Sequence, residues 1–213
     1  MTEEVKSKLL KVSVVVLVVL FIDQFSKIWI KTHLTLNESI RITNWFYISF
    51  IENNGMAFGM EFFNKIFLTS FRIVAVIAIG YYIYNAIKKG ARLGFAIPAA
   101  LIFAGALGNI IDCVFYGMIF SSSSGQVATF MPEGGGYATL FYGQVVDMLR
   151  FPLIETTLPS WIPWIGGSFF TFFDPVFNVA DSAICIGVFY ILLFQRKYFM
   201  SLDKEREEVV NKE

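Results

Sequence analysis

The sequence predicts an all-α integral membrane protein: four transmembrane helices with a small extracytoplasmic subdomain of β-strands and loops at the membrane surface. Hydrophobic residues account for 56% of the 213 residues and charged residues for 16%, whereas a soluble domain carries about 25% charged residues. The hydrophobic residues are grouped in runs of about 20, enough to cross a hydrocarbon layer about 30 Å thick. We therefore expect one membrane domain over residues 1–213.

The first run predicts a helix that crosses the membrane over about residues 9–29. A cleaved signal peptide would have a shorter apolar core and a small-residue cleavage site. Here Asp23 and Lys27 follow the core and the apolar pattern then resumes, so we expect this helix to be retained. Three further runs predict transmembrane helices over about residues 65–87, 93–115 and 178–195.

The stretch from Phe151 to Phe173 is apolar enough to imitate a fifth span. Three prolines and a Gly-Gly pair interrupt it, and these residues break a helix repeatedly. Its many aromatic residues suit the membrane–water boundary. We therefore expect an interfacial loop or short strands that rest on the bilayer. This choice matters, since a fifth helix would place Asp147 and Asp181 on opposite sides of the membrane.

Lysine and arginine residues are concentrated on one side of the four helices. They precede the first helix, join the second to the third and follow the fourth. By the positive-inside rule both termini are cytoplasmic, and the connections over about residues 31–64 and 117–177 lie outside. The charged residues 203–213 are then a cytoplasmic tail.

The two outer connections differ in composition. The first alternates in places between apolar and polar residues from Ile40 to Ile51, which predicts a pair of strands. It then has the turn signal Asn53-Asn54-Gly55. The second contains a serine- and glycine-rich insert over residues 118–140, which is typical of a flexible surface segment.

Asp147 and Asp181 are the strongest candidates for function. Each lies at the edge of an apolar run, where an ionisable group costs several kcal/mol unless it is paired or wetted. Such a group is therefore expected to be functional. Two carboxylates on one side of a membrane suggest a pair that shares a proton.

Four more polar residues lie within the helical runs. Asp23 and Lys27 are spaced i, i+4, so they either neutralise each other or hold substrate or catalytic groups. Asn109 and Asp112 share one helix face after a stretch of small residues that permits close packing. A hydrogen-bonded packing contact and a functional role both remain open for that second pair.

Several classes of site are disfavoured. His33 is the only histidine, so a histidine-based metal cluster is excluded, and Cys113 and Cys185 are expected to be packing residues. The zero net charge gives no electrostatic case for nucleic acid. The sequence also lacks the Gly-x-Ser-x-Gly motif of serine hydrolases.

Five motifs, in order and placed consistently against the four helices, resemble those of the bacterial lipoprotein signal peptidases, or type II signal peptidases. They cover most of the chain. They are Asp23-Gln-Phe-Ser-Lys27, Asn53-Asn-Gly-Met-Ala-Phe58, Gly105-Ala-Leu-Gly-Asn-Ile-Ile-Asp112, Val145-Val-Asp147 and Phe177-Asn-Val-Ala-Asp181.

The resemblance implies a membrane aspartyl endopeptidase that needs neither metal nor other cofactor. Its substrates would be prolipoproteins with a diacylglyceryl-modified cysteine in the lipobox, cut just before that cysteine. Asp147 and Asp181 would be the catalytic pair. The residues that would line or brace the site are Asp23, Lys27, Asn53, Gly55, Asn109, Asp112, Asn178 and Ala180.

The resemblance also implies partners and a location. The enzyme would contact membrane lipid, would be blocked by globomycin-type inhibitors, and is expected to be a monomer. It would lie in the bacterial cytoplasmic (inner) membrane, with its active site near the extracytoplasmic face.

The chain departs from the family at two places. Cys113 occupies a position where the family often has arginine, and the insert lengthens the segment between Asp112 and Asp147. Two other classes remain open: a small proton-coupled transporter, and an assembly or channel subunit without catalytic activity. The transporter would need acidic residues deep in the helices and an internal repeat, and the sequence shows neither.

Overall fold

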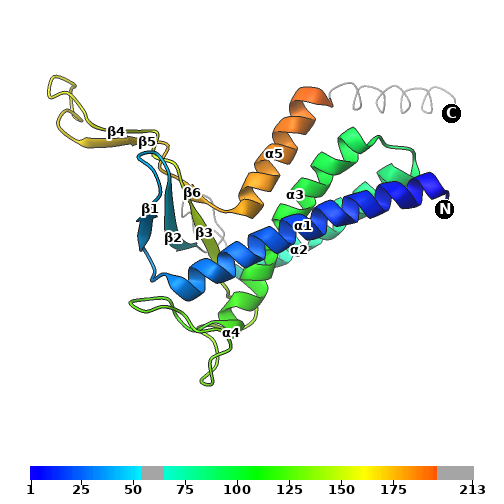
Figure 1. Ribbon diagram of the computed structural model, residues 1–213, viewed down its shortest axis with the longest axis horizontal. Helices are drawn as coiled ribbons and strands as arrows, with labels where there is room; N and C mark the ends of the chain where they lie inside the picture. Colours follow the sequence, from blue (N-terminus) through cyan, green and yellow to red (C-terminus); the bar gives the residue numbers. More distant parts are fainter. Residues whose placement is uncertain (54–64, 196–213) are drawn as a thin grey trace. The chain divides into compact units, whose positions relative to one another are not determined.

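The computed structural model describes residues 1–53 and 65–195 (Figure 1). The chain divides into two compact units. One unit consists of Met1–Asp23, Ser70–Ile110 and Val179–Glu213, and the other of Gln24–Thr69 and Ile111–Asn178. The turn signal at Asn54 and Gly55 and the charged tail 203–213 lie outside the described residues.

The first unit is helical, and a helix covers each stretch for which a transmembrane helix is predicted. These helices are α1 (Glu3–His33), α2 (Lys65–Lys88), α3 (Leu93–Ile111) and α5 (Val179–Phe194). The third continues as a short π-helix (Asp112–Tyr116) and α4 (Gly117–Ile119). The start of α2 and the last third of α1 belong to the second unit.

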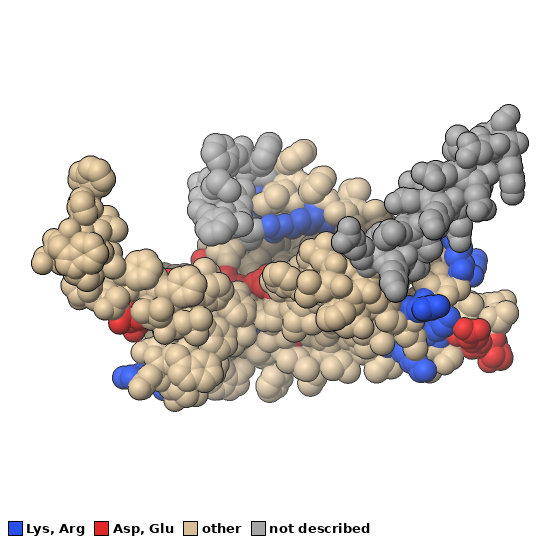
Figure 2. Space-filling model, turned by 90° about the horizontal axis from the view of Figure 1, so that it is seen from above, with Lys and Arg blue, Asp and Glu red and all other residues tan. Residues whose placement is uncertain are grey.

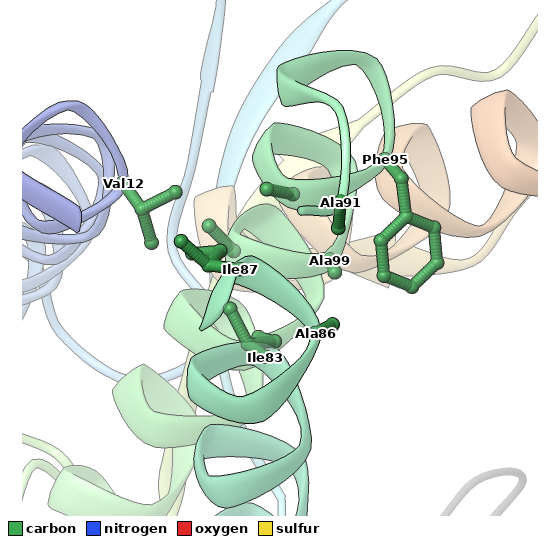
Figure 3. Packing of buried hydrophobic residues seen from close by; sticks show 9 residues of the cluster. Val12, Ile83, Ala86, Ile87, Ala91, Phe95 and Ala99 are labelled. Atoms are coloured by element: carbon green, nitrogen blue, oxygen red, sulfur yellow. The ribbon is translucent and has the colours of Figure 1, made fainter. Parts of the chain in front are cut away.

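Small and branched side chains fill the core of this unit. Val12 from α1 meets Ile83 and Ile87 from α2, with Phe95 and Ala99 from α3 (Figure 3). Ala96, Ala99 and Ala100 are buried along α3. A row of alanines lets neighbouring backbones approach closely, which is the packing that helices in a membrane use.

Two of the helices in the described part of the chain are long and apolar enough to cross a membrane by length and composition. They are α2, with 24 residues, and the continuous helix from Leu93 to Ile119, with 27. The apolar helix α5 is shorter, with 16 residues. On α2, Phe67, Phe71, Val74, Ile77 and Tyr81 are all exposed. Their helical spacing makes an apolar stripe, which favours contact with lipid over contact with water.

The second unit contains two antiparallel β-sheets, so the all-α prediction holds only for the helical part. The larger sheet has the strand order β1-β2-β3-β6. Its strands are β1 (Ser39–Arg41), β2 (Tyr47–Asn53), β3 (Val145–Arg150) and β6 (Val176–Phe177). The pair β1–β2 lies where the alternating residues predict two strands.

The smaller sheet is the hairpin of β4 (Ile154–Thr157) and β5 (Phe169–Phe172). It lies within the apolar stretch that imitates a fifth span, and this stretch contains no helix. Trp161 and Trp164, in the connection between the strands, are exposed. The β4–β5 hairpin is the projection on the left of Figure 2. Its outer part is tan, because no residue from Thr156 to Phe173 is charged.

Several backbone groups of the insert over residues 118–140 take part in hydrogen bonds. Backbone groups of Ser123, Ala128 and Tyr137 bond to Leu36, Lys31 and Phe120, and the side chain of Phe120 is fully buried. Most residues of the insert are exposed, as expected of a surface segment, and its flexibility stays a prediction. Serine and glycine here satisfy backbone partners and allow close packing.

Candidate active site

Asp147 lies in the middle of β3, where the first four residues of the strand are buried. Both carboxylate oxygens accept hydrogen bonds from asparagine side chains. Asn53, at the end of β2, donates to Oδ2, and Asn178 donates to Oδ1 at 2.7 Å. Asn178 also donates to the carbonyl oxygen of Val146 at 3.3 Å. Two amide donors from different segments fix the plane of this carboxyl group.

Asp181 lies in the first turn of α5. Its Oδ1 accepts a hydrogen bond from the Asn109 side chain on α3, at 2.8 Å. The backbone N–H groups in the first turn of a helix point outward and favour negative charge nearby. Asp181 is half-buried, so this carboxylate is held by an amide and supported by the helix terminus while keeping some access to water.

Asp23 holds the start of the same helix. Its Oδ1 accepts the backbone N–H of Ala180 at 2.9 Å, although the two residues lie 157 positions apart. Asp23 is completely buried. It therefore caps α5 from α1, as the side chain of a residue immediately before a helix usually does.

Two glycines of α3 make this contact possible. A Cβ atom at Gly108 would lie 2.6 Å from Oδ2 of Asp23, and one at Gly105 would lie 2.2 Å from the carbonyl oxygen of Ala180. Neither position has room for a larger residue unless the backbone shifts. The small-residue stretch that predicts close helix packing therefore accommodates the cap of α5.

Lys27 and Asp112 form a buried ion pair in the second unit. Nζ of Lys27 lies 2.7 Å from Oδ2 of Asp112, and neither side chain is exposed. Asp112 also accepts from the Gln24 amide at 3.0 Å and from the backbone N–H of Val146 at 3.4 Å. The Tyr116 hydroxyl donates to Gln24 at 3.1 Å. This network connects the end of α1 and the π-helix to the strand that carries Asp147.

These contacts show the partners of the four polar residues of the helices, whose functional role stays a prediction. Asp23 and Lys27 each have a partner on another helix, so mutual neutralisation alone does not account for them. Asn109 and Asp112 likewise bond to different groups, Asp181 and Lys27. Gly55 is outside the described residues, and Ala180 takes part through its backbone.

The structure adds residues that the sequence reasoning missed. Gln24 is one of them, and the second buried ion pair, Lys31 with Glu52, is another. Lys31 follows Lys27 by four residues, so both lie on one face of α1. Two features of the sequence could have pointed to the Lys31–Glu52 pair: this spacing on α1, and the position of Glu52 directly before Asn53.

The site is built from carboxylates and amides. Among the described residues, no group of three or more histidine, cysteine or acidic side chains could hold a metal ion. Cys113 is buried, and its carbonyl oxygen accepts the Gly143 N–H at 2.9 Å. Such an arrangement suits acid–base chemistry by aspartates.

Comparison with known proteins identifies a family with this architecture. The family model described as signal peptidase (SPase) II matches residues 15–196. The lipoprotein signal peptidase of Porphyromonas gingivalis is 48% identical over 197 residues, covering 92% of this chain and 87% of the relative. That of Amoebophilus asiaticus is 38% identical over 189 residues, covering 85% and 76%. A bacterial membrane enzyme solved by the in meso method at 2.3 Å resolution superposes with a TM-score of 0.60 at 25% identity, covering 88% of each chain.

Proposed function

The chain belongs to the signal peptidase II family, which removes signal peptides from prolipoproteins, and we propose that it does so as an aspartic endopeptidase. The catalytic pair of this proposal is Asp147 and Asp181. The main support for this pair is that asparagine side chains donate hydrogen bonds to both carboxylates. Asn53 and Asn178 donate to Asp147. Asn109 donates to Asp181. Amide donors orient a carboxylate without neutralising it by a counter-charge.

The proposed chemistry follows from the behaviour of two carboxyl groups that share a site. Both cannot ionise cheaply, so together they hold one proton. The ionised member accepts a proton from the attacking water while the protonated member polarises the scissile carbonyl. The pair then protonates the leaving amine. Because the two groups titrate together, their protons belong to the pair.

The remaining candidates have supporting roles in this proposal. Asp23 and Ala180 fix the start of the helix that carries Asp181, and Lys27 and Asp112 brace the strand that carries Asp147. Gly55 lies outside the described residues and stays a predicted site residue. No step of the reaction requires a metal or an organic cofactor.

The proposed substrate is a prolipoprotein whose lipobox cysteine carries diacylglycerol, cut just before that cysteine. The acyl chains would stay in the bilayer and bring the scissile bond to the site, so that orientation lowers the barrier. Globomycin-type peptides would compete with this substrate for the site. A monomer would suffice for cleavage.

A cleavage assay tests the proposed substrate. Purified enzyme in detergent meets a diacylglyceryl-modified prolipoprotein and, separately, the same protein without the modification. We expect cleavage of the modified protein, with mass spectrometry placing the lipidated cysteine at the new N-terminus, and inhibition by globomycin. Equal cleavage of both proteins, or a cut elsewhere, would contradict the proposed specificity.

We also propose that all four long helices cross the bacterial cytoplasmic membrane, with both termini cytoplasmic and the β4–β5 hairpin at the outer interface. The hairpin has exposed aromatic side chains and no charge beyond Glu155, which suits the boundary between lipid and water.

Tryptophan fluorescence tests the position of the hairpin. In a variant with Trp29→Phe and Trp45→Phe, only Trp161 and Trp164 emit. We expect bromine atoms attached near the lipid head groups to quench this emission in vesicles more strongly than aqueous acrylamide does. Quenching by acrylamide alone would show that the hairpin is in water.

A further inference from the structure

A second buried ion pair lies in the unit that carries Asp147. Lys31 is fully buried near the end of α1, and its amine pairs with the carboxylate of Glu52 on β2. The same amine lies 2.8 Å from the hydroxyl oxygen of Ser123. Three aromatic rings surround it, with centroids at 5.8 Å for Phe50, 5.5 Å for Phe120 and 4.8 Å for Tyr137.

Such a pair is a poor way to stabilise a fold. Removing two charges from water costs about as much as their attraction returns, and apolar residues of similar size are often at least as stable. Burial lowers the pKa of the Lys31 amine, and Glu52 acts against that effect. A role in positioning neighbouring groups would explain why the pair is present.

The register of β2 and β3 shows where the Lys31–Glu52 pair lies relative to Asn53 and Asp147. In the β2–β3 ladder, Glu52 is opposite Val146, and Ile51 is opposite Asp147. Side chains alternate between the two faces of a sheet, so Glu52 shares a face with Val146. Asn53 and Asp147 share the other face and are hydrogen bonded to each other. The ion pair therefore anchors β2 from the core side, one residue before the amide that holds Asp147.

The insert encloses this pair. Ser123, Phe120 and Tyr137 all belong to it. A Cβ atom at Gly136 would lie 2.0 Å from the carbonyl oxygen of Gly117, so this part of the insert packs directly against the first residue of α4. The Tyr137 hydroxyl accepts the backbone N–H of Gln144 at 2.7 Å, and burial raises the pKa of that hydroxyl. The insert is thus part of the support of the strands.

We propose that Lys31 and Glu52, enclosed by the insert, are positioning residues for peptide cleavage: they fix the end of β2 so that Asn53 holds Asp147 in its reactive orientation. This inference rests on the proposed role of Asp147. It assigns to the insert a function in catalysis that its composition does not suggest.

The test separates positioning from stability. Single variants, Lys31→Met or Glu52→Leu, leave one buried charge without its partner, and we expect both to lower the thermal stability of the protein in detergent. The double variant Lys31→Met/Glu52→Leu removes both charges, and we expect its melting temperature to return towards that of the parent. Its kcat should nevertheless stay about 10-fold or more below the parent value, with KM little changed, because misplaced catalytic groups are costly.

Asn53 supplies the second part of the test. If the ion pair acts through Asn53, then Asn53→Ala should lower kcat much less in the double variant than in the parent. Recovery of kcat together with the melting temperature would overturn the proposal, and so would equal effects of Asn53→Ala in both backgrounds. If Asp147→Asn retained parent activity, the proposed catalytic pair would fail first, which distinguishes the two failures.

Two neighbouring glycines test the role of the insert. Gly136→Ala places a methyl group against the backbone of Gly117 and Met118, whereas Gly134→Ala meets nothing within 4 Å. We expect the first to lower kcat as the Lys31→Met/Glu52→Leu variant does, and the second to leave it at the parent value. Parent-like kcat for both variants would contradict a role of the insert in catalysis.

Discussion

Replacement of Asp147 or of Asp181 by asparagine is expected to reduce cleavage by about 1,000-fold or more, since in the proposed mechanism each of these carboxyl groups transfers protons. The change keeps the size of the side chain. In the proposed mechanism it also removes the shared proton, because an amide can neither accept a proton from water nor return it to the leaving amine. Rates should be measured on the lipidated prolipoprotein at enzyme concentrations high enough to detect residual activity.

Asp174 offers a matched control. It is an exposed aspartate of the same unit as Asp147, and it pairs with Arg150 at 2.6 Å. Asp174→Asn should cleave at nearly the parent rate. Melting temperatures and gel-filtration profiles close to those of the parent would show that the two inactive variants are folded. Cleavage by a folded Asp147→Asn variant at a rate near the parent's would exclude it from the pair and make Asp112 the next candidate.

Replacement of Lys27 by methionine is expected to cause the largest loss of stability. Asp112 would remain fully buried without its cation, and breaking a buried pair in this way typically costs about 3–5 kcal/mol. The change should lower the melting temperature in detergent and reduce the yield of folded protein. Activity should fall as well, because Asp112 also accepts the N–H of Val146, next to Asp147.

The exposed pair of Lys6 and Glu3 provides the comparison. Its members lie 2.7 Å apart, but the side chains are 53% and 88% exposed. Solvent screens such a pair, so Lys6→Met should change the melting temperature little. Equal effects of Lys6→Met and Lys27→Met would show that burial of the Lys27–Asp112 pair is unimportant for folding.

Much of the helical framework could be predicted from the sequence because its signal is local. Runs of about 20 apolar residues predict helices at the places where α1, α2, α3 and α5 lie. The prolines and glycines between Phe151 and Phe173 correctly indicated strands and turns in place of a helix. How many of the four helices cross the membrane stays a prediction.

The partners of the candidate site residues were less accessible. Asp23 and Lys27 are neighbours on one helix, and this local spacing suggested a pair. Their partners, Ala180 and Asp112, come from segments far along the chain. Contacts of that kind depend on how helices pack, and a single sequence has no local signal for packing.

The insert shows the limit of composition as a guide. Serine and glycine predict flexibility when their backbone groups bond only to water. Here Ser123 bonds to a buried lysine, and Gly136 allows the chain to touch α4. The same residue types serve close packing as readily as motion, and only the neighbours in space distinguish the two.

The cap on α5 has a consequence for the order in which the enzyme matures. A ribosome makes Asp23 early and Ala180 157 residues later. Until α5 has been made, the buried carboxylate of Asp23 on α1 cannot accept the hydrogen bond from the N–H of Ala180. The start of α5, next to Asp181, is therefore fixed only after α1, α2 and α3 have been made. With the proposed catalytic role of Asp181, a nascent chain that still lacks α5 is expected not to cleave signal peptides.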